Sequence, residues 1–318
     1  MPALTTAWSL GTAWLSRSRS TASYGSSSIQ GRRPNQEDRF HACPQLPGRP
    51  DCAMYAVYDG HGGYRAAAFC ADRMQGFLTK SKAFKARDLG RALQDAFCEC
   101  EAEFIAIAGR EGLRDGTTAV VTLVEADTLT VAHVGDSRAV LCRAGGETVH
   151  VTLDHKPEVA AERQRIEALG GFVSYIGCWR AMGILAMSRA IGDLFLKPYV
   201  SPEPDVQTIQ LGPTDEFIVL ASDGLFDVFD NEQVVRLVRS AASPTEGASL
   251  LTESAFAAGS LDNITAVVVA LKGYKPSTTA SSVAEPSVSV GVRSLVRSAM
   301  GEATFMGDVL WGGSGRWG

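Results

Sequence analysis

Acidic side chains stand at the ends of apolar segments throughout this sequence. Asp59 ends the stretch "AMYAVY", Asp223 ends "FIVLAS", and Asp262 comes shortly before "ITAVVVAL". A carboxylate drawn towards a protein core is destabilising unless it is paired or bound to a metal ion. Each one alone could close a turn, because Asp-Gly is a strong turn dipeptide. Their repetition instead predicts that they meet at one site.

The kinds of side chain in this acidic set narrow the choice of metal. Oxygen donors without a cysteine or histidine cluster favour Mg²⁺, Mn²⁺ or Ca²⁺ over Zn²⁺ or copper, and the absence of an EF-hand loop argues against a Ca²⁺ switch. Carboxylates from distant segments fit a two-metal hydrolytic centre, in which ions about 3.5–4 Å apart generate hydroxide from water. Arg33 would be the natural anion clamp. The acidic candidates are Glu37, Asp38, Asp59, Asp136, Asp223, Asp227 and Asp262.

The elements that must position these residues include several strands in close succession. The links "EADT", "GDSR" and "AGGE" are too short for helical crossovers, so each predicts an antiparallel hairpin and a doubly wound nucleotide-binding sheet is disfavoured. The predicted strands are Thr118–Val124, Leu129–Val134, Ala139–Arg143, Thr148–Thr152, Phe217–Ala221 and Ile264–Leu271.

Helical patterns lie on either side of these strands. Pro157 is expected to open one helix in its first turn, and Gly170–Gly171 to close it. Helices in pairs beside antiparallel strands predict an α+β domain with helices layered on sheets. The other predicted helices are Tyr64–Lys80, Asp88–Arg110, Gln233–Ala242 and Glu246–Ala258.

Composition argues against several classes of protein. The chain has 318 residues and a net charge of −5, without the basic excess of a nucleic-acid binder. Its seven cysteines are odd in number and form no C-x-x-C pair, which argues against a disulfide framework or a zinc ribbon and favours a reducing compartment. No run of apolar residues is long enough to predict a membrane span.

Three regions are expected along the chain. Residues 1–23 carry arginine, serine and threonine but no acidic residue, which suits either a disordered tail or an organellar targeting peptide. Residues 24–271 form one dense block, and 272–318 read as a Ser/Gly-rich tail. We expect an intracellular protein of the cytosol or nucleus, with a mitochondrion or plastid as the alternative.

The motifs of the dense block resemble those of the metal-dependent protein serine/threonine phosphatases of type 2C, the PPM-type family. The matching stretches, in the family's order, are "GRRPNQEDRF", "YDGHGG", "DGTTAVV", "VAHVGDSRAVL", "DHKPEVAAERQRIEALGGFV", "LAMSRAIGD", "ASDGLFDV" and "LDNITAVVV". The resemblance implies an antiparallel β-sandwich flanked by helices on both faces, with the metal centre at one end. It also implies hydrolysis of phosphoserine and phosphothreonine on proteins by a metal-bridging water or hydroxide.

The resemblance further implies a role for each matching residue. Asp59 would bridge two Mg²⁺ or Mn²⁺ ions, and the backbone carbonyl of Gly60 would be a ligand. His61 would protonate the leaving group. Arg33 would clamp phosphate, Glu37 would bind metal, and Asp38 would support them. Asp223 and Asp262 would complete the central pair, and a weaker third ion would use Asp136 and Asp227, with Asp223 shared.

Some features of the sequence leave alternatives open. Met182 stands where the family often has Asn before Gly, in the segment 171–183 that should include the family's flap beside the site. "SRAIGD" is expected to support the core, with Gly192 in a turn. A catalytically silent partner-binding relative would be expected to lose a metal carboxylate, whereas a small-molecule phosphate-ester hydrolase would differ only in its pocket. We expect a monomer acting on phosphoproteins.

Overall fold

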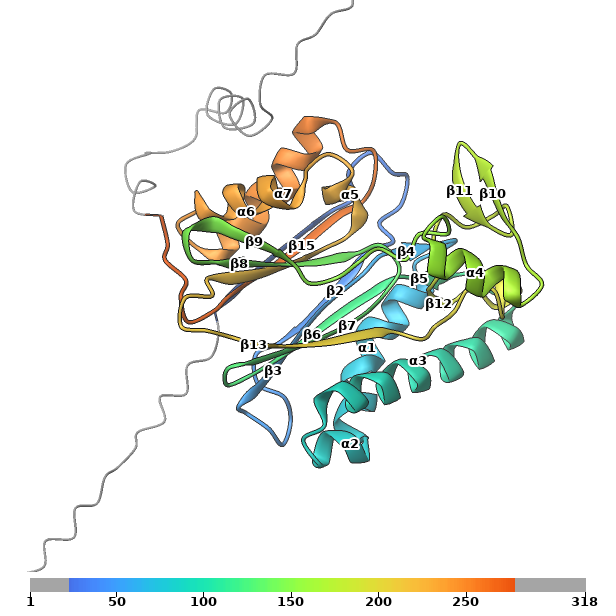
Figure 1. The fold of residues 1–318 in the computed structure, drawn as a ribbon, viewed down its shortest axis with the longest axis horizontal. Helices are drawn as coiled ribbons and strands as arrows, with labels where there is room; N and C mark the ends of the chain where they lie inside the picture. Colours follow the sequence, from blue (N-terminus) through green and yellow to red (C-terminus); the bar gives the residue numbers. More distant parts are fainter. Residues whose placement is uncertain (1–22, 278–318) are drawn as a thin grey trace, which may run out of the picture.

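Two five-stranded antiparallel sheets form the centre of the computed structural model, which describes residues 23–277 (Figure 1). One sheet has the order β13-β7-β6-β3-β2 and the other β1-β15-β14-β8-β9. Their bounds are β1 Tyr24–Ile29, β2 Arg39–Cys43, β3 Cys52–Tyr58, β6 Ala119–Glu125, β7 Thr128–Val134, β8 Arg138–Arg143, β9 Glu147–His150, β13 Asp205–Gln210, β14 Phe217–Ala221 and β15 Ile264–Ala270. The expected tail 1–23, apart from its last residue, and most of 272–318 lie outside the described residues.

Helices cover both outer faces of this sandwich (Figure 1). In Figure 1 α1–α3 lie against the sheet containing β3, and α5–α7 lie against the sheet containing β14. The predicted α+β sandwich flanked by helices is therefore confirmed. The helices are α1 Arg65–Lys80, α2 Lys82–Lys85, α3 Leu89–Glu111, α4 Ala160–Ala168, α5 Asp223–Phe226, α6 Asn231–Arg239 and α7 Pro244–Ala258. Within residues 23–277 no helix is both long and apolar enough to cross a membrane.

The strand β3 shows why the central strands are apolar along their whole length. Met54, Ala56 and Tyr58 pack towards the helices, whereas Tyr55 and Val57 pack against the opposite sheet. Successive side chains of a strand point to opposite faces. Because both faces are covered, every position is buried and the run reads as continuous rather than alternating. This double burial fixes where the strand ends, and therefore where Asp59 lies.

The prediction of a hairpin at "GDSR" was wrong. β7 pairs with β6 and β13, whereas β8 pairs with β14 and β9, so this link carries the chain from one sheet to the other. Loop length favours a hairpin but does not select the sheet that the next strand joins. Gly135 turns the chain with φ +90°, where an added Cβ would collide with Thr118. The hairpins at "EADT" and "AGGE" are confirmed.

The helix α4 begins later than its sequence predicted. Pro157 lies in a turn before the helix, and Val159, the residue that precedes its first turn, has extended backbone angles. Lys156 accounts for this delay, because its ammonium pairs with Asp136, between β7 and β8, and its carbonyl accepts from the Val159 N–H at 3.1 Å. The turn is thus set by a contact distant in sequence.

Two small elements complete the fold beside α4. The strands β4 (Gly60–His61), β5 (Gly116–Thr117) and β12 (Ile191–Gly192) form a short antiparallel sheet in the order β12-β5-β4. The hairpin of β10 (Val173–Ile176) and β11 (Cys178–Ala181) projects from the same side of the molecule (Figure 1). This hairpin lies in the predicted flap segment 171–183.

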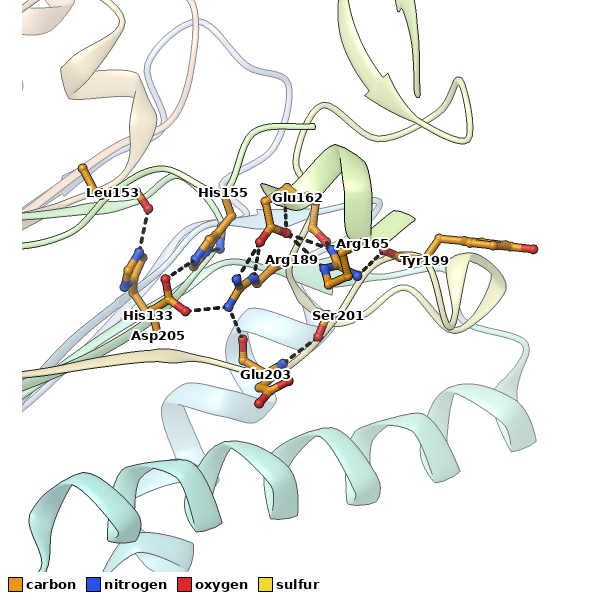
Figure 2. A network of polar contacts seen from close by, with 12 residues as sticks. His133, Leu153, His155, Glu162, Arg165, Arg189, Tyr199, Ser201, Glu203 and Asp205 are labelled. Carbon is orange, nitrogen blue, oxygen red and sulfur yellow. Dashed lines mark hydrogen bonds and ion pairs between the residues drawn. The ribbon is translucent and has the colours of Figure 1, made fainter. Parts of the chain in front are cut away.

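A buried polar network joins α4 to the sandwich (Figure 2). Glu162 accepts hydrogen bonds from Arg189 at 2.6 Å and from Arg165 and Ser188 at 2.9 and 2.8 Å. Arg189 also donates to Asp205, at the start of β13, at 2.7 Å. Burial raises the pKa of Glu162, but the hydrogen bonds from Arg189 and Arg165 outweigh it and lower the pKa to about 2. The ionised carboxylate therefore stabilises the folded chain.

We expect Glu162→Gln to destabilise the fold by about 2 kcal/mol at pH 7. Because the folded-state pKa of Glu162 lies below its ordinary value, its contribution is present above pH 5 and is lost as the pH falls towards 2. Urea unfolding between pH 3 and 7 should show the difference between wild type and variant shrinking with acid. Glu167→Gln is the matched control on the same helix: its exposed pair with Arg163 should contribute less than about 0.5 kcal/mol. Equal effects of the two substitutions would contradict the prediction.

The turn after β11 places a disfavoured residue in the left-handed region. Met182 and Gly183 have φ of +55° and +70°, and the Ile184 N–H donates to the Ala181 carbonyl at 3.0 Å. Two successive positive φ angles are typical of a type I′ turn, which favours Asn-Gly. The departure from Asn-Gly seen in the sequence therefore carries a conformational cost of about 1 kcal/mol.

We expect Met182→Gly to be more stable than Met182→Ala by about 1 kcal/mol, because both variants lose the side chain and only glycine relieves the left-handed strain. Urea unfolding measures the difference. The matched pair is Tyr175→Gly and Tyr175→Ala in β10, where the alanine variant should be the more stable. A more stable alanine variant at position 182 would sink the strain argument.

Candidate metal centre

The acidic residues lie at one end of the sandwich because of strand direction. Asp59 follows the last residue of β3, Asp136 lies between β7 and β8, and Asp223 follows β14. Ala221, at the end of β14, pairs with Arg138 at the start of β8 and with Ala266 near the start of β15. Asp262 precedes β15 and therefore arrives at the same end.

Electrostatic coupling shows that these carboxylates are neighbours. Burial raises the pKa of Asp59 well above its ordinary value, and Asp223, Asp38, Asp136 and Asp262 raise it further. Burial and the like charges of Asp136, Asp227 and Asp262 act in the same direction on the pKa of Asp223. Negative charges buried together repel one another and require a cation.

Unpaired oxygen atoms support that requirement. Asp136 Oδ1 and Asp223 Oδ1 are buried and have no hydrogen-bond partner among the residues that the structure describes. A buried acceptor without a partner is uncommon in folded proteins. Carboxylate oxygens are the ligands that Mg²⁺ and Mn²⁺ prefer. The residues present therefore fit hard divalent cations.

Gly60 lets a second segment approach the cluster. A Cβ at this position would lie 2.6 Å from the Glu37 carbonyl oxygen, so only glycine allows the two backbones to pack together. The Glu37 N–H donates to Asn263 Oδ1 at 2.8 Å, and the Asn263 amide donates to the Gln30 carbonyl at 2.7 Å. The N-terminal loop is thereby fixed beside Asp262.

Hydroxyl groups hold the innermost carboxylates in place. Ser222 donates to Asp38 at 2.8 Å, and burial raises the pKa of Asp38 to about 6. Thr117 Oγ1 donates to the Asp59 carbonyl at 3.0 Å, and the Asp59 N–H donates to Thr118 Oγ1 at 3.1 Å. The sequence reasoning did not assign these hydroxyl residues, although the threonines lie in "DGTTAVV".

Two cationic side chains pair with carboxylates of the cluster. Arg33 pairs with Asp262, and its side chain is 56% exposed. Lys156 pairs with Asp136. Burial lowers the pKa of Lys156, but Asp136 outweighs it and the net shift is upward. Lys156 was not predicted as a site residue, because its segment "DHKP" was interpreted only as the start of the helix that Pro157 opens.

His61 differs from the other histidines in its surroundings. Its Nε2 lies 2.7 Å from Asp193 Oδ2, while Nδ1 is buried and has no hydrogen-bond partner within residues 23–277. The structure therefore brings each predicted site residue to the same end of the sandwich. Arg33 reaches it through its ion pair with Asp262, and His61 because it follows Gly60 in the chain. The roles of these residues stay predictions.

A second group of possible ligands lies in the network of Figure 2. One ligand atom each of His133, His155 and Asp205 lies within 4.8 Å of the others. His155 Nδ1 accepts the Gly135 N–H at 3.1 Å, and burial lowers the pKa of His155 to about 4, so the neutral ring carries its proton on Nε2, facing Asp205. No lone pair of His155 remains for a metal ion.

The geometry of His133 also argues against a metal ion in this group. The ring of His133 stacks on that of His155 with centroids 4.5 Å apart and planes at 12°, and its Nε2 faces the Leu153 carbonyl at 2.8 Å. A metal ion binds in the plane of an imidazole, and two parallel planes do not meet at one ion. We therefore interpret this group as a hydrogen-bonded support for the segment before Lys156.

Comparison with known proteins gives a consistent result. The family model described as protein phosphatase 2C matches residues 22–264. Probable protein phosphatase 2C 59 of Arabidopsis thaliana is 42% identical over 247 residues, covering 78% of this chain and 79% of the relative. Probable protein phosphatase 2C 45 of Oryza sativa subsp. japonica is 40% identical over 247 residues, covering 78% of this chain and 86% of the relative.

A solved structure shows the same likeness in three dimensions. The crystal structure of serine-threonine phosphatase 2C from Toxoplasma gondii matches with a TM-score of 0.74 at 29% identity, covering 78% of this chain and 94% of the other. The sandwich, the carboxylates gathered at its end and the match of sequence over most of the chain agree, and we conclude that this chain belongs to the protein phosphatase 2C family.

Proposed function

We propose that this chain removes phosphate from phosphoserine and phosphothreonine of proteins at the carboxylate cluster. Membership of the family makes the chain a metal-dependent serine/threonine protein phosphatase. The observation that carries the assignment to this cluster is the position of the half-buried Asp59 among carboxylates that raise its pKa.

The ligands of two central ions come from separate segments. The groups that would hold these ions are Glu37, Asp59, the Gly60 carbonyl, Asp223 and Asp262. Such ions supply a nucleophile from water at neutral pH and offset the charge of the phosphate. Asp136 and Asp227, with Asp223 shared, would hold a weaker third ion. The pairing of Asp136 with Lys156 supports weaker binding there, because the lysine competes for the carboxylate.

The chain's own side chains bind and protonate the substrate. Arg33 is exposed enough to turn from Asp262 to a phosphate oxygen, where its guanidinium can bind two oxygens at once. Asp38 holds its position through Ser222. His61 gives a proton from Nδ1 to the serine or threonine oxygen as the P–O bond breaks, because an alkoxide is a poor leaving group.

For the domain bounds and the cellular location of the enzyme, the proposal keeps what the sequence predicts. We propose a phosphatase domain over 24–271 between N- and C-terminal tails, acting as a monomer on phosphoproteins. The cytosol or nucleus is the proposed location, and a fluorescent fusion with and without residues 1–23 tests the organellar alternative. The presence of every expected carboxylate disfavours a silent relative.

The first test is metal-dependent phosphate release from a phosphothreonine peptide. We expect activity with Mg²⁺ or Mn²⁺, none after EDTA, and nearly none for Asp59→Asn with either ion. The substitution should also stabilise the metal-free fold by about 1 kcal/mol or ~3 °C, because it removes a charge that its neighbours disfavour.

Calorimetric metal titration separates binding from catalysis in this variant. Asp127→Asn is the matched control, because Asp127 pairs with Lys272 outside the cluster. It should change neither metal affinity nor melting temperature appreciably. Unchanged metal affinity in Asp59→Asn would rule out the proposed centre. Faster turnover of small phosphate esters than of phosphopeptide at equal concentrations would favour the small-molecule alternative.

The second test concerns His61. We expect His61→Gln to lower kcat on phosphothreonine peptide by roughly 10²–10⁴-fold, the usual contribution of a general acid. The loss should shrink on p-nitrophenyl phosphate, whose leaving group needs little protonation. Metal affinity should change little. An equal loss on both substrates would show that His61 positions the centre and does not donate a proton.

A further inference from the structure

Asp193, in the motif "SRAIGD", is a buried carboxylate that the proposed function does not use. Its side chain is 1% exposed, and its Oδ2 lies 2.7 Å from His61 Nε2. The residue has φ +51° and ψ +47°, the left-handed region that costs a non-glycine residue about 1–2 kcal/mol. Strain of this kind persists only where surrounding contacts hold it, and it is common at functional sites.

The short sheet β12-β5-β4 brings these two residues together. His61 pairs with Gly116 of β5, and Gly116 pairs with Gly192, the neighbour of Asp193. A Cβ on Gly116 would collide with both the Asp193 carboxylate and His61 Nε2. The glycine at the centre of this sheet is therefore what allows the carboxylate and the imidazole to meet.

Backbone contacts fix Asp193 from behind. Its N–H donates to the Asp115 carbonyl at 3.0 Å. The N–H of Gly192 donates to Glu101 Oε2 at 2.8 Å, and Glu101 pairs with Lys197 at 2.8 Å. Asp193 is thus attached to α3 and β5 and cannot follow a movement of His61. The Asp193 carboxylate therefore fixes the orientation of the His61 ring, and not the reverse.

The chemistry of an imidazole makes this constraint specific. A carboxylate accepts only, so Nε2 must carry a proton and donate it to Asp193. The other ring nitrogen, Nδ1, then faces away from Asp193. It is buried and has no hydrogen-bond partner within residues 23–277. The bond made by one ring nitrogen decides what the other can do.

We infer that Asp193 is a positioning residue that holds the His61 ring with Nε2 bound and Nδ1 directed at the leaving oxygen of the substrate. The inference rests on the proposed role of His61. For this transfer both ring nitrogens of His61 carry a proton. As the P–O bond breaks, its electron pair goes to the serine or threonine oxygen, which takes the Nδ1 proton and leaves a neutral ring protonated on Nε2, while water supplies the oxygen that binds phosphorus. Solvent returns the proton to the ring.

The test compares substrates of different leaving groups. Asparagine tolerates the left-handed region, so Asp193→Asn should fold while replacing the carboxylate with an amide. We expect kcat on phosphothreonine peptide to fall roughly 10- to 100-fold and kcat on p-nitrophenyl phosphate to fall less than about threefold. The double variant with His61→Gln should be no slower on the peptide than His61→Gln alone, because both act on one proton transfer.

A matched control and a direct measurement complete the experiment. Glu101→Gln disturbs the same loop without touching His61, so any loss should be equal on the two substrates. In metal-free protein, at a pH where the His61 ring is neutral, ¹H–¹⁵N correlation of the histidine rings should show the proton on Nε2 in the wild type and a mixture of the two neutral forms in Asp193→Asn. This readout needs no activity.

The outcomes separate the two proposals. If His61→Gln is selective for the peptide but Asp193→Asn slows both substrates equally, the inference is wrong and the role of His61 stands. If Asp193→Asn leaves the His61 ring in the wild-type form, the inference is also wrong. If His61→Gln slows both substrates equally, both proposals fail together.

Discussion

The repulsion among carboxylates buried at one end of the sandwich is the constraint on which the rest of this structure depends. Burial raises the pKa of both Asp59 and Asp223, and the like charges of neighbouring carboxylates raise both further, so the metal-free site opposes folding. Three apolar layers, one under each set of helices and one between the sheets, provide the opposing stabilisation. The central strands are apolar on both faces because helices cover one face and the opposite sheet covers the other, and this packing holds the charged strand ends together.

Much of this frame could be predicted from local pattern. Phe217–Ala221 is a strand with the bounds predicted, and the helix after Asp88 begins there, because apolar runs and capping residues act over a few positions. The link at "GDSR" could not be predicted in the same way. Whether β8 joins the sheet of β7 or the other sheet depends on partners far along the chain, such as Ala221. Loop length carries no information about them.

The residues of the site also differ in whether local pattern could predict them. Asp59, Asp223 and Asp262 could be found because each stands close to an apolar run, which makes a carboxylate conspicuous. Lys156 and Asp193 could not, because each meets its partner, Asp136 or His61, across 20 or 132 residues. Both lie in motifs whose local interpretation, a helix start and a core turn, gave no reason to look further. Resemblance to a family supplied the predicted ligands and one supporting residue, Asp38, but neither Lys156 nor Asp193.

The contrast between His61 and His155 shows how surroundings assign chemistry to identical side chains. His155 has both nitrogens engaged, one by a backbone N–H and one by Asp205, and burial lowers its pKa to about 4, so near neutrality its single ring proton is bound by Asp205 and its lone pair by the Gly135 N–H. His61 has one nitrogen against Asp193 and the other without a partner in the described chain. A histidine engaged on one side only can face a substrate and keep its orientation. The free nitrogen of His61, more than its place in the sequence beside Asp59, therefore makes it the candidate acid.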